Sequence, residues 1–171
     1  DFLNLFKFRF IKYSATFIGV FFLSAYFFLF IKNLNINNDH ILNIADKIEY
    51  HYGNTKYETF AMGDMAGKVS YLLDKKLIQL EGLVGGKKVL KKIQNQENLC
   101  KLFKEFNVDI YLTTKINKVG ELYFIEEPSQ ESANVKKMAG KLIIGPEITF
   151  KSANLNVHAF NLKNNNFCLN D

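Results

Sequence analysis

The chain has 171 residues, of which 48% are hydrophobic and 15% aromatic, and its formal net charge is +5 at pH 7. This length suits one domain with its own core, and this composition excludes a disordered chain, a collagen-like fibre and a disulfide-dense miniprotein. The charge does not indicate a nucleic-acid binder, because Arg9 is the only arginine and the lysines are scattered along the chain. The cysteines Cys100 and Cys168 have no metal-binding or redox spacing, and the sequence leaves open whether they pair.

An apolar stretch near the N-terminus predicts a transmembrane helix over 13–31. No charged residue interrupts the run YSATFIGVFFLSAYFFLFI, which lies between Lys12 and Lys32. As a helix this run would extend roughly 28 Å, close to the hydrocarbon thickness of a bilayer. Two alternatives fit this run less well. A buried core helix usually keeps a polar face, and a cleaved signal peptide has a shorter apolar region followed by a small-residue cleavage site; the run shows neither pattern.

Flanking charge sets the expected orientation of this helix. Lys7, Arg9 and Lys12 precede it, whereas Lys32 stands alone until Lys47. The positive-inside rule makes 1–12 a cytoplasmic flank and places everything after Lys32 outside. We therefore expect an integral membrane protein, of a bacterial inner membrane, with its C-terminal domain outside the cytoplasm. Because the chain begins at an aspartate followed by apolar residues, we also expect it to be the C-terminal part of a longer protein.

After a polar linker over 32–38, the sequence predicts a small α/β domain over 39–115. Asp39 is a candidate N-cap for a helix that ends at Gly53. Strands are then expected over 57–62, 77–80 and 109–114, and helices over 66–73, 87–95 and 97–106. This alternation predicts βαβ crossovers and a sheet of about three parallel strands.

The remaining residues, 116–171, predict a β-rich C-terminal extension. Short strands are expected over 121–125, 141–144, 147–150 and 154–160. The long polar segment 126–139 is either a flexible surface loop or a segment that orders on a partner. The expected fold class is thus α/β, with one N-terminal transmembrane helix and a β-rich C-terminal end.

The run AMGDMAGKVSYLL places Gly63, Asp64 and Gly67 at the turn from a predicted strand into a helix. It is not a P-loop, because three residues instead of four separate the glycines, and Val69 instead of Ser or Thr follows Lys68. One interpretation is purely structural: Asp64 caps the helix and Gly67 allows the helix to pack closely on the sheet.

The second interpretation is a binding site. If the strands are parallel, Asp64 and Glu81 follow their carboxyl ends, at the sheet edge where open α/β sheets bind ligands. Two carboxylates there could bind a hydroxylated ligand such as a sugar, or a cation. The candidate ligand-binding residues are Asp64, Lys68, Glu81 and Thr114, with Gln79 and Thr113 nearby, and the candidate structural residues are Gly63, Gly67 and Gly82.

Sets of catalytic residues are scarce. His40, His51 and His158 belong to no H-E-x-x-H or H-x-x-E-H zinc motif, and no G-x-S-x-G nucleophile elbow occurs. We therefore assign no catalytic residue and no metal ligand. One lysine cluster is either a solvated helix face or a patch that attracts anionic lipid headgroups. It consists of Lys87, Lys88, Lys91 and Lys92.

The transmembrane helix, the short helix after it and the run GDMAGKVSYLLDKKLIQLEGLV resemble the C-terminal extracytoplasmic domain of GT-C-type glycosyltransferases. These are dolichyl- or polyprenyl-phosphate-sugar-dependent, mannosyltransferase-like membrane proteins, in which a (G/H)-D-x-G-type turn precedes G-Y-L and L-x-G-L-V. The matching positions are Gly63, Asp64 and Gly67, then Tyr71 and Leu72, then Leu80, Gly82, Leu83 and Val84. NVDIYLTT (107–114) resembles a later strand of the family, and the resemblance covers 39–115.

The resemblance implies the C-terminal fragment of a multi-spanning glycosyltransferase with a lipid-phosphate-linked sugar donor. In that superfamily the catalytic acid lies far upstream, so this domain would cap the active site or position a glycan or protein acceptor. It also implies membrane lipid as a partner and no cofactor in this chain, with a divalent cation as a candidate cofactor of the full-length enzyme. The alternative is a single-pass membrane-anchored binding or assembly module without catalysis.

Overall fold

The computed structural model describes residues 2–171 except 64, 82–85, 129–135, 154, 164–165 and 170–171, and within 2–17 and 33–39 it describes the backbone alone. The chain divides into two compact units, Asp1–Asp39 and His40–Asp171. Helix α1 (Phe2–Tyr52) is continuous, so one helix covers the ranges predicted as flank, apolar helix, linker and second helix. Its side chains over 18–32 are all exposed.

The membrane predictions do not agree with this helix. Among the residues that the structure describes, no helix has the length and apolar character needed to cross a bilayer. The predicted transmembrane helix over 13–31 is therefore wrong, and so is the integral-membrane location that was derived from it.

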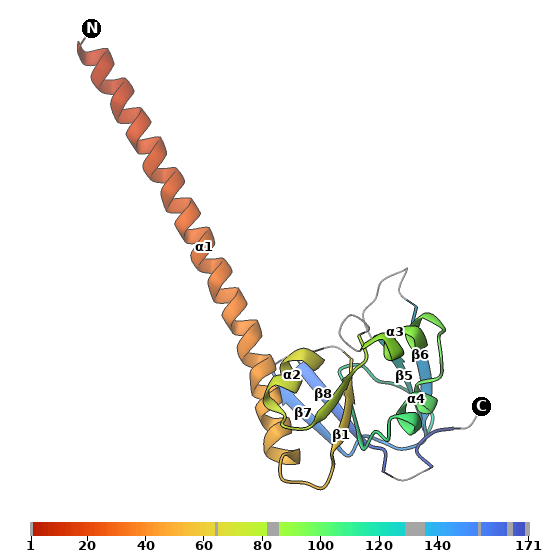
Figure 1. Cartoon of the computed structure of the whole chain (residues 1–171). Helices are drawn as coiled ribbons and strands as arrows, with labels where there is room; N and C mark the ends of the chain where they lie inside the picture. The colour runs from red at the N-terminus through yellow and green to blue at the C-terminus, as the bar shows by residue number, and fades with distance from the viewer. Residues whose placement is uncertain are drawn as a thin grey trace. The chain divides into compact units, whose positions relative to one another are not determined.

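The second unit is built on a mixed five-stranded sheet, named sheet A (Figure 1). Across the sheet its strands are β2 (Lys76–Gln79), β1 (Thr59–Met62), β3 (Ile110–Thr113), β8 (Leu155–Asn161) and β7 (Ile148–Ser152). β1 pairs in parallel with both β2 and β3, as the alternation of strands and helices predicts. β8 is antiparallel to β3, and β7 is antiparallel to β8.

A second, antiparallel sheet, named sheet B, is formed by the chain between β3 and β7. Its strands are β4 (Asn117–Val119), β5 (Leu122–Glu127) and β6 (Met138–Leu142), in that order across the sheet. The predicted fold class is therefore wrong in its sheet as well: sheet A is mixed rather than built of about three parallel strands, and the β-rich range 116–171 divides between the two sheets. Three of its strands form sheet B, and the last two return to sheet A. Strand periodicity identifies a strand but not its pairing partner, so the sequence pattern did not reveal this division.

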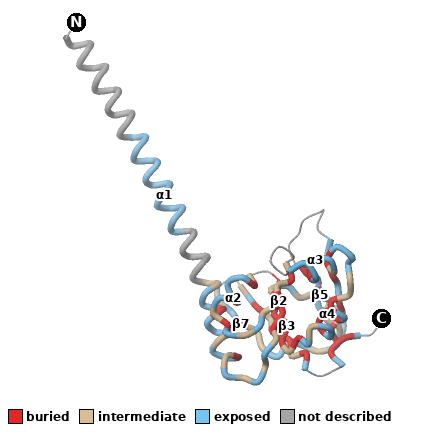
Figure 2. The backbone as a smooth tube through the Cα atoms, in the orientation of Figure 1, coloured by how far each residue is buried: buried red, intermediate tan, exposed pale blue. Residues whose placement is uncertain are grey.

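Two hydrophobic cores lie on opposite faces of sheet A, because successive residues of a strand point to opposite faces. In β3, Ile110 and Leu112 pack with α1 and with α2 (Ala66–Leu72) in the first core. Tyr111, between them, packs in the second core with α3 (Gly86–Gln94), α4 (Leu99–Glu105) and sheet B. Figure 2 shows the buried residues gathered along the strands and the inward sides of these helices.

Ion pairs fix α3 against α4. The Nζ of Lys88 lies 2.6 Å from Glu105 Oε1, and the Nζ of Lys92 lies 2.7 Å from Glu105 Oε2 and 2.8 Å from Glu97 Oε2. Hydrogen bonds from the two lysines hold the pKa of Glu105 below its ordinary value. Two members of the predicted lysine cluster thus contact α4 rather than extending freely into solvent.

A disulfide joins Cys100 in α4 to Cys168 near the C-terminus, which answers the question that the sequence left open. Cys168 also forms an isolated β-bridge with Leu142 of β6, and both cysteines are buried at the second core. The bond therefore fastens the C-terminal segment to α4 beside sheet B.

Removal of this disulfide should destabilise the fold. The bond spans 68 residues of sequence, and in the chain-entropy model closing a loop of that length stabilises the folded state by about 4 kcal/mol, within a usual range of 2–5. We expect a double variant, Cys100→Ser with Cys168→Ser, to unfold at a lower urea concentration by about that free energy. Dithiothreitol should lower the urea midpoint of the wild-type chain by a similar amount and leave the urea midpoint of the double variant unchanged. Equal urea midpoints for both proteins would contradict the prediction.

Candidate functional site

The strand order of sheet A reverses at β1. The chain passes from β1 through α2 to β2 on one side, and then through α3 and α4 to β3 on the other side of β1. α2 belongs to the first core and α3 and α4 to the second, so the two crossovers lie on opposite faces of the sheet. Open α/β sheets bind ligands at such a switch point, beyond the carboxyl ends of the strands. Here that position lies between Gly63, after β1, and Thr113, at the end of β3.

The carboxylate of Glu127, at the end of β5, occupies this switch point. Its side chain is buried, with the residue 1% exposed. Oε1 accepts a hydrogen bond from the Tyr111 hydroxyl at 2.7 Å and one from Thr113 Oγ1 at 3.4 Å. Oε2 lies against Gly63, at the place where a Cβ atom would stand in any other residue. A side chain from sheet B therefore fills the space between Gly63 and Thr113 at this edge of sheet A.

Gly63 should consequently be intolerant of a side chain. In Gly63→Ala the new methyl group would overlap Glu127 Oε2, and the carboxylate cannot swing into solvent because it is buried and hydrogen-bonded. We expect a loss of about 1–3 kcal/mol in the free energy of unfolding, as for other overpacked sites. The matched control is Gly67→Ala in α2, where no atom lies within 4 Å of the added Cβ and stability should be unchanged or rise by up to about 1 kcal/mol. Equal urea midpoints for the two variants would refute the steric argument.

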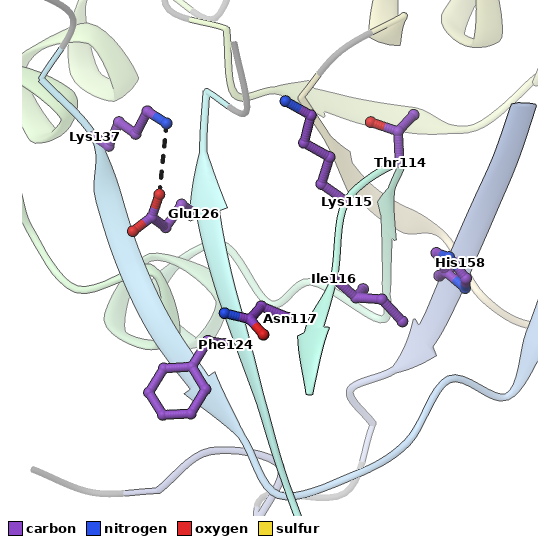
Figure 3. Close-up of a pocket in the computed structure, with 8 residues that line it drawn as sticks. All are labelled: Thr114, Lys115, Ile116, Asn117, Phe124, Glu126, Lys137 and His158. Carbon is purple, nitrogen blue, oxygen red and sulfur yellow. Dashed lines mark hydrogen bonds and ion pairs between the residues drawn. The ribbon is translucent and has the colours of Figure 1, made fainter. Parts of the chain in front are cut away.

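A cavity of about 500 Å³ lies past the end of β3, between the two sheets (Figure 3). Its lining residues come from both sheets and from the segments beside them. They are Thr114, Lys115 and Ile116 after β3, Asn117 of β4, Phe124 and Glu126 of β5, Lys137 before β6, and His158 of β8. The volume is in the range of small-molecule binding sites, and the lining combines an aromatic ring with amide, hydroxyl, carboxylate and ammonium groups.

Glu126 and Lys137 form an ion pair along one wall of the cavity, drawn as a dashed line in Figure 3. The Lys137 Nζ lies 3.5 Å from Glu126 Oε2, and 60% of the Glu126 side chain is exposed. Exposed pairs at such a distance contribute little to stability. Little folding free energy is therefore lost when both groups turn toward a polar ligand.

His158, on the opposite wall, is held neutral at pH 7. Burial lowers its pKa below the ordinary value, and the charge of Lys151 lowers it further. Its Nδ1 lies 2.9 Å from the hydroxyl of Thr149. His158 therefore offers the cavity a hydrogen-bonding ring rather than a positive charge.

The lowered pKa of His158 makes stability depend on pH. The unfolded chain binds a proton at His158 more readily than the folded chain, so folding stability is highest above the ordinary His pKa of about 6.5 and falls as pH drops below it. In thermal unfolding scans between pH 7.5 and 5, His158→Asn should show a smaller fall in Tm than the wild type. If Tm falls by the same amount in the wild type and in His158→Asn over this pH range, His158 is not the cause of the pH dependence.

The parallel pairing of β1 with β2 and β3 brings the ends of these strands, with Gly63, Glu81 and Thr114 after them, to one edge of sheet A. Thr114 lines the cavity, and Gly63 lies at the switch point against Glu127. Lys68 is exposed on α2 and Glu81 follows β2, and neither lines the cavity. Asp64 and Gly82 lie outside the residues that the structure describes.

The structural interpretation of the glycine turn also changes. Met65 occupies the N-cap position of α2, with a φ of 70° in the left-handed region, and among the described residues no side chain forms a capping hydrogen bond there. Gly67 is exposed with open space around its Cα, so it does not serve close packing of α2 on the sheet.

Sequence reasoning did not identify most of the cavity lining. Asn117, Phe124, Glu126 and Lys137 lie in the segment predicted as a β-rich extension and a polar loop. One signal was present in the strand LYFIEE: the period of two places Phe124 and Glu126 on one face and Ile125 on the other. No pattern in the chain, however, indicated that this face opens beside the end of β3.

Among the residues that the structure describes, no three His, Cys, Asp or Glu side chains are grouped as metal ligands would be. Comparison with protein-family models, with curated proteins and with solved structures gives no match. The resemblance to GT-C-type glycosyltransferases, the lipid-phosphate sugar donor and the divalent cation of a full-length enzyme therefore stay predictions.

Proposed function

We propose that the unit His40–Asp171 is a carbohydrate-binding module that serves a glycosyltransferase, and that the catalytic acid of that enzyme lies outside this unit. The observation that carries the proposal is the cavity between the sheets, whose lining includes the ring of Phe124 together with Asn117, Glu126 and Lys137. The module would hold a glycan acceptor, which is the role that the sequence resemblance implies for such a domain.

The polar lining suits hydroxyl groups, each of which has one donor and two acceptor positions. Glu126 accepts hydrogen bonds, the ammonium group of Lys137 donates them, and the amide of Asn117 does both. Lys137 is paired with Glu126 and His158 is neutral, so these three groups add no net charge to the lining, to which Lys115 contributes a further ammonium group.

The apolar residues of the lining suit the C–H groups of a sugar, just as the polar residues suit its hydroxyl groups. A pyranose ring has a face of C–H groups, and such a face packs on aromatic or aliphatic side chains. Phe124 and Ile116 supply both kinds of surface in the same cavity as the polar groups. Apolar walls with a few oriented polar groups are the usual construction of a small-molecule site.

The proposal predicts saccharide binding that depends on Asn117. We expect the intact 171-residue chain to give saturation-transfer difference NMR signals with at least one of mannose, glucose and N-acetylglucosamine. Asn117→Ala should weaken that binding by roughly 3- to 10-fold, because one hydrogen bond contributes about 0.5–1.5 kcal/mol.

The matched control is Asn156→Ala, an exposed asparagine of β8 outside the cavity, which should leave the affinity unchanged. Failure of all three sugars and their trisaccharides to bind would refute the proposed function. An equal loss of affinity in both asparagine variants would place the binding elsewhere on the chain.

A further inference from the structure

A second cavity adjoins the first on sheet B. Its volume is about 440 Å³, and it shares Phe124, Glu126 and Lys137 with the cavity described above. Beyond these shared residues it extends over β6 to Gln96 and Asn98, which follow α3. The two cavities are thus continuous along one surface, and the ring of Phe124 belongs to both.

Strand register explains why this surface is open. Ile125 of β5 and Gly140 of β6 pair with each other and face the second core, where Gly140 lies against Leu99 and Cys100 of α4, and both residues also contribute to the lining of the second cavity. Their neighbours in the strands point the opposite way. The resulting row across the sheet is Asn117, Phe124 and Lys141, and the next row pairs Glu126 with Ala139.

The span of this surface exceeds one sugar ring. Neighbouring strands lie about 4.8 Å apart, so the row from β4 to β6 extends about 10 Å before the side chains are counted. From this continuity we infer that the ligand is an oligosaccharide of at least two rings, which lies across the open face of sheet B from His158 to Gln96. The inference rests on the proposed function, because it takes the first cavity to be a sugar site.

Gln96 provides an independent observation at the far end of this surface. Its backbone φ is 53°, and its N–H donates to Ile93 O while the N–H of Glu97 donates to Lys92 O, both at 3.0 Å. These two bonds form a Schellman motif that ends α3, with Gln96 at the C′ position. Glycine is strongly favoured at that position because a Cβ is strained there. The chain instead keeps a side chain with an amide group, and that residue lines the second cavity.

The test compares each monosaccharide with its trisaccharide: mannose with mannotriose, glucose with maltotriose and N-acetylglucosamine with chitotriose. On the intact chain the trisaccharide should bind at least tenfold more tightly than its monosaccharide. Gln96→Gly should raise Tm and yet lower trisaccharide affinity several-fold, while monosaccharide affinity stays unchanged. A purely structural residue would not combine higher stability with this selective loss.

Asn107→Gly is the matched control. Asn107 has a φ of 49° after α4, with the same pair of backbone hydrogen bonds, and it lines neither cavity. This variant should also raise Tm, and it should leave both affinities unchanged. If the monosaccharide and the trisaccharide bind with equal affinity, the oligosaccharide inference is overturned. The proposed function still stands in that case, provided that Asn117→Ala weakens the binding of both. If the wild-type chain binds none of these saccharides, both the proposed function and the oligosaccharide inference are refuted.

Discussion

A buried carboxylate joins the two sheets, and the rest of the second unit depends on it. Removal of a carboxylate from water is expensive unless hydrogen bonds replace the lost hydration. Glu127 obtains them from the hydroxyls of Tyr111 and Thr113, both on β3. The missing side chain of Gly63 supplies the room. These polar contacts fix the end of β5 at the carboxyl edge of sheet A, while Ile125 packs in the second core beside them.

This contact also decides where a ligand can bind. Because Glu127 occupies the switch point, the cavity lies farther out, between the segment after β3 and the open face of sheet B. Sheet B is covered on one face by the second core and open on the other, as antiparallel sheets commonly are. The Cys100–Cys168 disulfide links α4 to the C-terminal segment that bridges to β6, and the ion pairs of Glu105 join α3 to α4. The loop between those two helices then forms the far end of the surface.

Local elements could be predicted from sequence, whereas their partners could not. The expected strand over 109–114 is β3 (Ile110–Thr113), and the expected helix over 97–106 contains α4 (Leu99–Glu105). Both follow from hydrophobic periodicity and end signals, which act within a few residues. The expected strand over 141–144 starts too late, because β6 begins at Met138, inside a range taken for a polar loop. The transmembrane prediction, made from an uninterrupted apolar run and its expected length as a helix, failed as well, because no helix among the described residues has the length and apolar character to cross a bilayer.

Over 59–113 the sequence by itself determined the order of strands and helices and the parallel pairing around β1, because βαβ crossovers leave few alternatives. It also placed Thr114 at the end of β3, where the cavity begins. Only the tertiary structure decided that β7 and β8 return to sheet A, that Cys100 meets Cys168, and that Glu127 fills the switch point. Those contacts join residues far apart in the chain, and they are selected by shape, burial and hydrogen bonding in the folded state rather than by any local pattern.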